Sequence, residues 1–219
     1  MIRPLHVASS FVRWIALVAL LSLGAAGAAG AQSSSDCRSP QPRSVGVAIG
    51  RSSPYAELAS GFLLAEGGSV SVRSGLQVAG RVDIPIAGPL RVRVEGASSR
   101  WDMRRTVYDA DAGYRVVDER SIGSMSERHL VALAGVRTGR APFCAHVSAG
   151  GGFYALGFRD ASHRRAGGAI AAGMEIPTGS RGAVQLDVTL HLIGTRDADP
   201  IASTVVPAAA LTIGWAYRF

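Results

Sequence analysis

The chain has 219 residues, of which 47% are apolar and only 18% charged. Globular proteins carry about 25% charged residues, so this composition excludes both a disordered chain and a coiled coil. The net charge is +7, but the arginines are spread along the sequence. A nucleic-acid surface would need them clustered on one face, so we expect no nucleic-acid partner.

The first residues have the three parts of an export signal. Arg3 and Arg13 give a positive start, residues 14–23 are apolar, and residues 25–31 are a small-residue tail that ends in Ala29-Gly30-Ala31. That ending fits a signal-peptidase site. The apolar run is shorter than the roughly 20 residues of a membrane-spanning helix. We therefore predict a cleaved signal peptide at 1–31.

The remainder reads as strands, because apolar and polar residues alternate with a period of two. The clearest case is 182–194, where Val184, Leu186 and Val188 oppose Gln185 and Asp187. The strand at 127–138 is apolar on both faces. We predict an all-β, antiparallel fold with strands at 44–51, 70–86, 90–96, 127–138, 142–157, 165–176, 182–194 and 204–219.

The connections between these strands alternate in length. Short turns are expected near 86–89, 139–141 and 177–181, and longer polar loops at 52–69, 102–126, 158–164 and 195–203. Short turns at one end and long loops at the other are typical of membrane barrels. Loop 102–126 is the longest and follows Trp101, so it is the best candidate site for an extracellular ligand. Its acidic residues lack the spacing of a calcium loop, and we predict no metal site.

The polar faces of the strands collect the charged residues. Eight strands enclose a space that side chains can fill, whereas an arginine facing lipid at the midplane would cost about 2–4 kcal/mol. We therefore expect the apolar faces outside and a charge network in the lumen, formed by Arg73, Arg81, Asp83, Arg91, Arg93, Glu95, Glu175, Asp187, His191 and Arg218. A plugged lumen favours a structural or surface-binding role, and a small porin-like channel is the alternative.

The last strand carries a family resemblance. The chain ends in LTIGWAYRF, with Leu211, Ile213, Trp215, Tyr217 and Phe219 on one face. This ending resembles the assembly signal of bacterial outer-membrane barrels, and the mature chain resembles the eight-stranded OmpA/OmpX/OmpW-like barrels. The resemblance implies an up-and-down transmembrane barrel over 44–219, preceded by a periplasmic segment at 32–43. It also implies the barrel-assembly machinery as a partner in biogenesis, outer-membrane lipid and lipopolysaccharide as surroundings, and no cofactor.

Two other functions stay open. His146 and Ser148 have the H-x-S spacing of lipid A deacylases, and residues two apart on a strand share a face. The pair faces the predicted lumen, however, and no Asn follows Ser148. His191 and Asp187 are a second pair that could hydrogen-bond. Because the His146–Ser148 pair departs from the deacylase pattern, we expect a protein that is not an enzyme. A soluble exported lipid-binding barrel is the remaining alternative.

The two cysteines are expected to form a disulfide. In the topology that the resemblance implies, Cys144 lies just past a periplasmic turn and Cys37 lies shortly before the first strand. Both then sit near the periplasmic rim, in an oxidising compartment. The alternative is a pair of buried free thiols.

Overall fold

The computed structural model describes residues 37, 43–54, 68–109, 115–140, 142–158, 161–178, 180–194 and 205–219. The predicted signal peptide 1–31 and all of segment 32–43 except Cys37 and Arg43 lie outside them. The strands are β1 (Ser44–Pro54), β2 (Gly68–Arg73), β3 (Gly75–Ala87), β4 (Leu90–Asp109), β5 (Arg115–Arg140), β6 (Phe143–Phe158), β7 (Ala161–Pro177), β8 (Gly182–Gly194) and β9 (Val205–Arg218). The described part of the chain contains no helix with the length and apolarity needed to cross a membrane.

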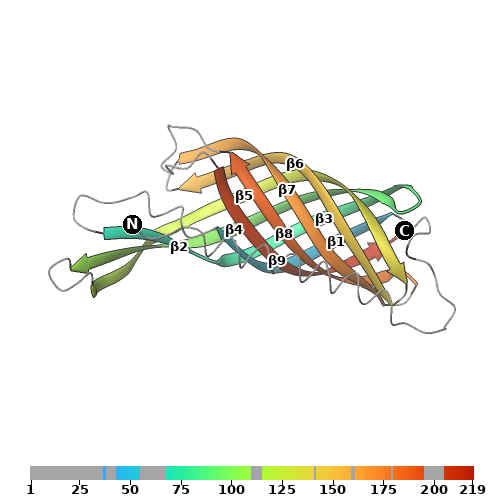
Figure 1. The fold of residues 1–219 in the computed structure, drawn as a ribbon, viewed down its shortest axis with the longest axis horizontal. Coiled ribbons are helices and arrows are strands. Elements are labelled where there is room, and N and C mark those ends of the chain that lie inside the picture. Colours follow the sequence, from blue (N-terminus) through green and yellow to red (C-terminus); the bar gives the residue numbers. More distant parts are fainter. Residues whose placement is uncertain are drawn as a thin grey trace.

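The strands close into a ring. The hydrogen-bonded order is β4-β3-β1-β9-β8-β7-β6-β5, and β5 pairs again with β4. Among the described strands, β2 pairs with β4 alone, in line with β3, so it continues β3 outward. All pairings are antiparallel, and the strands wind around the barrel axis at a tilt (Figure 1). The predicted eight-stranded up-and-down barrel is confirmed.

The predicted short turns all lie at one end of the barrel. They join β3 to β4 after Ala87, β5 to β6 after Arg140 and β7 to β8 after Pro177. Gly88 has a φ of 51°, which glycine adopts without the steric cost that other residues meet. The start of β1 and the end of β9 lie at this same end, because Ser44 pairs with Arg218. We call it the short-turn end.

A break at Ser74 corrects the prediction of one strand at 70–86. Arg73 pairs with Asp102, but Gln77 pairs with Ser99, so the register shifts by one residue between β2 and β3. A one-residue shift exchanges the two faces of a strand. Val72 therefore points inward and Leu76 outward. Arg73, predicted in the lumen, instead lies outside it with its side chain 53% exposed.

Most of the predicted loop 102–126 is strand, which is a second correction. Asp102 pairs with Ser124 and Val107 with Asp118, and residues 110–114 lie outside the described residues. β5 is 26 residues long, whereas about 9–11 residues cross a membrane. Together with β2, these segments form an outer extension, defined here as 68–73, 102–109 and 115–124, which projects from the barrel at the left of Figure 1.

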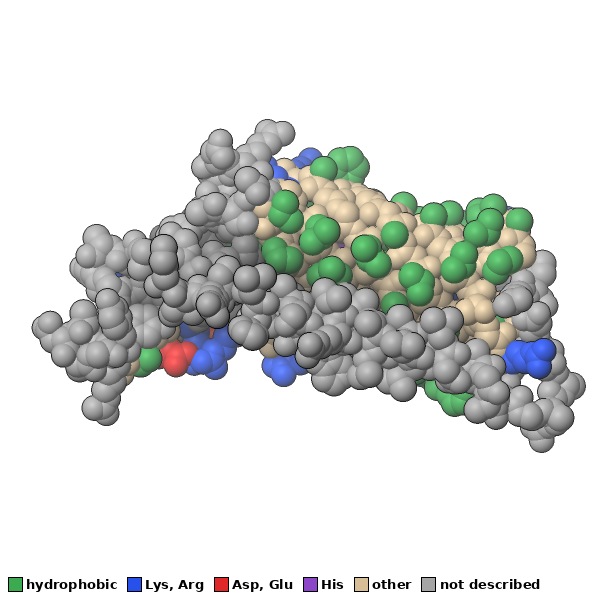
Figure 2. All heavy atoms as spheres, in the orientation of Figure 1, with side chains coloured by type: hydrophobic (Ala, Val, Ile, Leu, Met, Phe, Trp, Pro, Cys, Tyr) green, Lys and Arg blue, Asp and Glu red, His purple; other side chains and the backbone are tan. Residues whose placement is uncertain are grey.

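The wall of the barrel is apolar on its outside. Figure 2 shows hydrophobic side chains spread over the visible wall. The most exposed apolar side chains of the described residues include Val47, Ile86, Leu130, Phe153 and Phe219. The predicted assembly residues Leu211, Ile213, Trp215, Tyr217 and Phe219 all lie on this outer face. Charged residues fill the inside, so the arrangement is the reverse of a water-soluble barrel.

An apolar cluster fills the lumen toward the outer extension. Its outer part is formed by Trp101, Met125, Leu156, Ile193 and Val206, all of which are buried. The Trp101 indole Nε1 donates to the Ser52 hydroxyl at 3.3 Å. Between this cluster and the short-turn end lies the polar part of the lumen.

Candidate functional site: the charged lumen

Among the described residues, ten charged side chains form a paired network in the lumen, with equal numbers of arginines and carboxylates. Alternation along each strand places them there, since every second residue faces inward. Five are arginines and five are carboxylates: Arg81, Arg91, Arg93, Arg137 and Arg218 with Asp83, Glu95, Glu127, Glu175 and Asp187. Buried charges are costly unless they are paired. Nine of the ten contact an opposite charge, and Glu127 contacts His129.

Asp187 on β8 is the hub of the central layer. Its carboxylate accepts from Arg81 Nη1 at 2.5 Å and from Arg93 Nη1 at 2.9 Å, and His146 Nε2 lies 2.5 Å from Oδ1. Arg81 also donates to Glu95 at 2.5 Å and to the Thr212 hydroxyl at 2.7 Å. These bonds link strands on opposite sides of the barrel and leave little free space at its centre.

A second layer lies at the short-turn end. Glu175 accepts from Arg137 at 3.0 Å and from Arg218, and Arg91 lies 3.9 Å from it. A pocket of about 30 Å³ opens beside these residues, which is space for one or two water molecules. The charge layer therefore reaches the rim of the barrel.

The predicted disulfide closes the same rim. Cys37 and Cys144 are bonded, with Cα atoms 5.8 Å apart. The Cys37 backbone N–H donates to the Gly139 carbonyl at 3.2 Å. Cys144 faces inward as expected, so the bond fixes Cys37, seven residues before the start of β1, to the base of β6.

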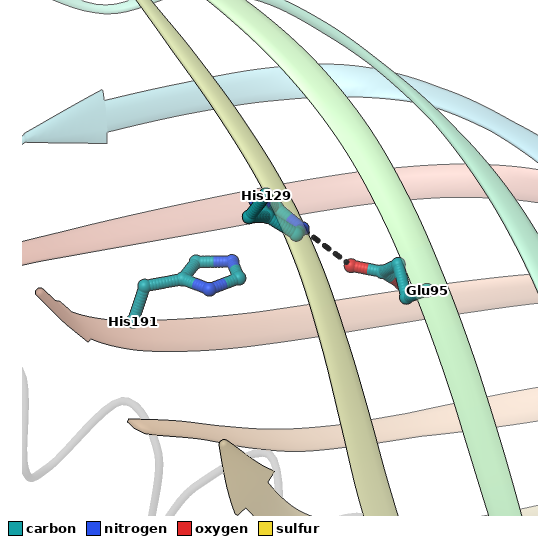
Figure 3. Close-up of side chains that lie close together, drawn as sticks. All are labelled: Glu95, His129 and His191. Carbon is teal, nitrogen blue, oxygen red and sulfur yellow. Dashed lines mark hydrogen bonds and ion pairs between the residues drawn. The ribbon is translucent and has the colours of Figure 1, made fainter. Parts of the chain in front are cut away.

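A third layer of histidines lies between the hub and the apolar cluster. His129 Nδ1 is 2.7 Å from Glu127 Oε1, and its Nε2 is 3.3 Å from Glu95 Oε1. The ring of His191 lies 4.6 Å from that of His129, centroid to centroid, and its Nδ1 is 3.0 Å from the Tyr154 hydroxyl. Figure 3 shows Glu95, His129 and His191 converging from three strands.

The alternative His146–Ser148 pair makes no hydrogen bond in the structure. His146 and Ser148 are both buried in the lumen, but His146 Nε2 is engaged by Asp187 rather than by Ser148. The predicted pair of His191 and Asp187 is also absent among the described contacts, because His191 bonds to Tyr154 instead.

The sequence analysis did not assign four of the lumen residues to the lumen: Glu127, His129, Arg137 and Tyr154. The strand that carries the first three is apolar on both faces, with Leu130 and Val136 outside and Val131 and Leu133 inside. Their odd numbers place them all on one face with period two. That spacing was the available signal.

Two solved outer-membrane barrels have similar structures. Neisserial surface protein A matches with a TM-score of 0.54 and 11% identity, over 81% of this chain and 97% of that one. The outer membrane protein OprG from Pseudomonas aeruginosa matches with a TM-score of 0.54 and 12% identity, over 82% and 97%. No family model matches the sequence, and neither does any curated protein. The chain thus has the fold of eight-stranded outer-membrane β-barrels.

Proposed function

We propose that this chain is an integral outer-membrane barrel with a structural role, closed to ions. The exposed apolar wall is the first support, because apolar side chains are stable in contact with lipid tails but costly to expose to water. At the short-turn end, Phe143, Trp215, Tyr217 and Phe219 are exposed together on the outside. Aromatic residues at this level are typical of the membrane interface in such barrels.

The observation that carries the proposal is the filled lumen. Asp187 and Arg93 are almost completely buried at its centre, and the paired charges around them occupy the space that permeating ions would need. Farther out, Trp101 has no exposed surface. An ion would have to break several buried ion pairs and pass an apolar layer.

Planar-bilayer recording tests the closed lumen. We expect the folded barrel to give no steady single-channel current in concentrated KCl. A variant in which Arg81, Arg93, Asp83 and Asp187 are all replaced by serine serves as the opened control and should conduct. Steady currents from the unaltered barrel would overturn the proposal.

Lipopolysaccharide is the proposed lipid partner of the outer boundary. Arg128 on β5 and Arg164 on β7 are both exposed and occupy one register row, each paired with Ala155. Guanidinium groups bind phosphates with two parallel hydrogen bonds. The row faces outward, at the end of the wall opposite the short-turn end, where we expect the outer-leaflet headgroups.

Vesicle composition tests this partner. The urea midpoint of the barrel should rise when lipid A is added to phosphatidylcholine vesicles, and Arg128→Gln with Arg164→Gln should remove the rise. Arg140→Gln, an exposed arginine at the short-turn end, is the matched control and should keep it. An equal rise in all three would exclude the arginine row.

We further propose that the chain is not a hydrolase. His146 and Ser148 are both buried inside the wall, where the acyl chains of a lipid have no access. Ser148→Ala should therefore leave lipid A acylation unchanged in cells that express the barrel. Mass spectrometry of extracted lipid A measures this, and a Ser148-dependent loss of an acyl chain would contradict it.

The last strand is proposed to bind the assembly machinery. Leu211, Ile213, Trp215, Tyr217 and Phe219 present one apolar row, and strand pairing is a general mode of recognition. Removal of Phe219 should slow membrane assembly in cells while refolding of the purified chain in detergent stays efficient. Equal slowing in both settings would show that Phe219 acts through stability alone.

A further inference from the structure

Three side chains from three strands converge inside the barrel. Glu95 on β4, His129 on β5 and His191 on β8 each offer one ligand atom, and these atoms lie within 4.8 Å of one another. All three residues are buried. Figure 3 shows the His191 ring directed toward the pair formed by His129 and Glu95.

The Nε2 atom of His191 is the one potential ligand atom of this group that makes no hydrogen bond. His191 is only 3% exposed, and its Nε2 has no hydrogen-bond partner among the residues that the structure describes. The other ring nitrogen, Nδ1, lies 3.0 Å from the Tyr154 hydroxyl. That contact fixes the ring, so the lone pair of Nε2 can point to a ligand.

The surrounding hydrogen bonds orient all three groups. His129 Nδ1 lies 2.7 Å from Glu127, while its Nε2 faces Glu95. Arg81 donates to Oε2 of Glu95 and leaves Oε1 toward His129. Metal-bound histidines and carboxylates in proteins are held by outer hydrogen bonds of this kind, which fix the imidazole tautomer and strengthen the ligand.

We propose that Glu95, His129 and His191 bind one divalent transition-metal ion of the zinc class. Two imidazoles and one carboxylate are the donors that Zn²⁺, Co²⁺ and Ni²⁺ accept. Bonds of about 2.0–2.1 Å at tetrahedral angles place ligand atoms roughly 3.3 Å apart. His129 Nε2 and Glu95 Oε1 are already 3.3 Å apart, so the site needs only an approach of His191.

The ion would link three strands at the level where the charge network meets the apolar cluster. Its binding releases any proton held on His129 Nε2, since a metal ligand must be deprotonated. The carboxylates of Glu95 and Glu127 offset the ionic charge, and a water molecule completes the coordination. This site is independent of whether the lumen conducts.

Metal content of the purified barrel tests the proposal. The untagged chain, without the predicted signal peptide, is refolded in detergent with Zn²⁺ and washed with EDTA. We expect one zinc per barrel, because the site is closed to the chelator. His191→Gln should lower the retained zinc at least tenfold, whereas His146→Gln, a buried histidine that bonds to Asp187 outside the group, should retain it.

A second measurement does not depend on the variants. Refolding with Co²⁺ should give the visible absorption bands of a four-coordinate site with nitrogen and oxygen ligands. Heat-modifiable gel mobility checks that each protein is folded. Absence of retained zinc and of these bands in the unaltered barrel would overturn the proposal, and would show that His129 only joins two carboxylates through its protons. Equal retention by folded His191→Gln would overturn it as well.

Discussion

Replacement of Asp187 by alanine should be the most damaging change in the lumen. The substitution leaves Arg81, Arg93 and His146 without the carboxylate that all three contact. Hydrogen bonds to charged groups contribute about 1.5–3 kcal/mol each, and loss of one partner from a buried ion pair typically costs about 3–5 kcal/mol. We therefore expect the free energy of unfolding to fall by about 4 kcal/mol, at the centre of that range.

Reversible urea unfolding in lipid vesicles, followed by tryptophan fluorescence, measures this loss. Glu119 is the matched control, because it also contacts two arginines, Arg73 at 2.5 Å and Arg104 at 3.4 Å, but on the exposed extension. Glu119→Gln should cost no more than about 1 kcal/mol, as exposed pairs do. Adding Arg93→Gln to Asp187→Ala should recover part of the loss, because it removes the arginine charge that Asp187 no longer balances. A loss below about 1 kcal/mol for Asp187→Ala would refute the reasoning, because water would then solvate the buried arginines.

Three further predictions concern other parts of the barrel. Gly173→Ala should lower the free energy of unfolding by about 1–3 kcal/mol, because a Cβ there would lie 2.4 Å from a backbone carbonyl of β8, whereas Gly80→Ala, which meets nothing within 4 Å, should be neutral. Urea titration compares the two. Cys37→Ala should destabilise the barrel by at most about 4–5 kcal/mol, the chain-entropy value for a loop of roughly 100 residues, and unreduced, denatured wild-type protein should resist thiol labelling. The Ser121 hydroxyl and a neighbouring guanidinium donate to Asp102 and hold the pKa of its carboxyl below the usual value. Because the folded-state pKa is lowered, this contact stabilises the outer extension at neutral pH and is lost as the pH falls from about 4 through the lowered value. Amide hydrogen exchange of the extension should show this loss, and Asp102→Asn should abolish the pH dependence.

The barrel wall could be predicted because each strand with one lipid face alternates in polarity. Val184, Leu186 and Val188 lie toward the outside, and Gln185 and Asp187 lie inside. The break at Ser74 could not be predicted, because the alternation of apolar and polar residues continues across it. One irregular residue nevertheless exchanges the two faces of the strand. Arg73 was assigned to the wrong side for this reason.

The outer extension was missed for a different physical reason. Outside a membrane, strands need no apolar face, so 102–109 and 115–124 carry polar residues on both sides and read as a loop. Pairing partners such as Arg104 and Glu119 become visible only when the strands are aligned. His129 was missed because it lies on a strand whose two faces are both apolar, so neither face indicates the lumen.

The pairing of arginines with carboxylates inside the barrel limits how its interior can evolve. A single replacement that adds or deletes one charge leaves an unmatched neighbour with no solvent to rescue it. Neutral drift must then proceed through compensated swaps, such as an arginine and a carboxylate lost in the same lineage. Conversion of this barrel into a pore should therefore remove one arginine and one carboxylate of the lumen together at each step.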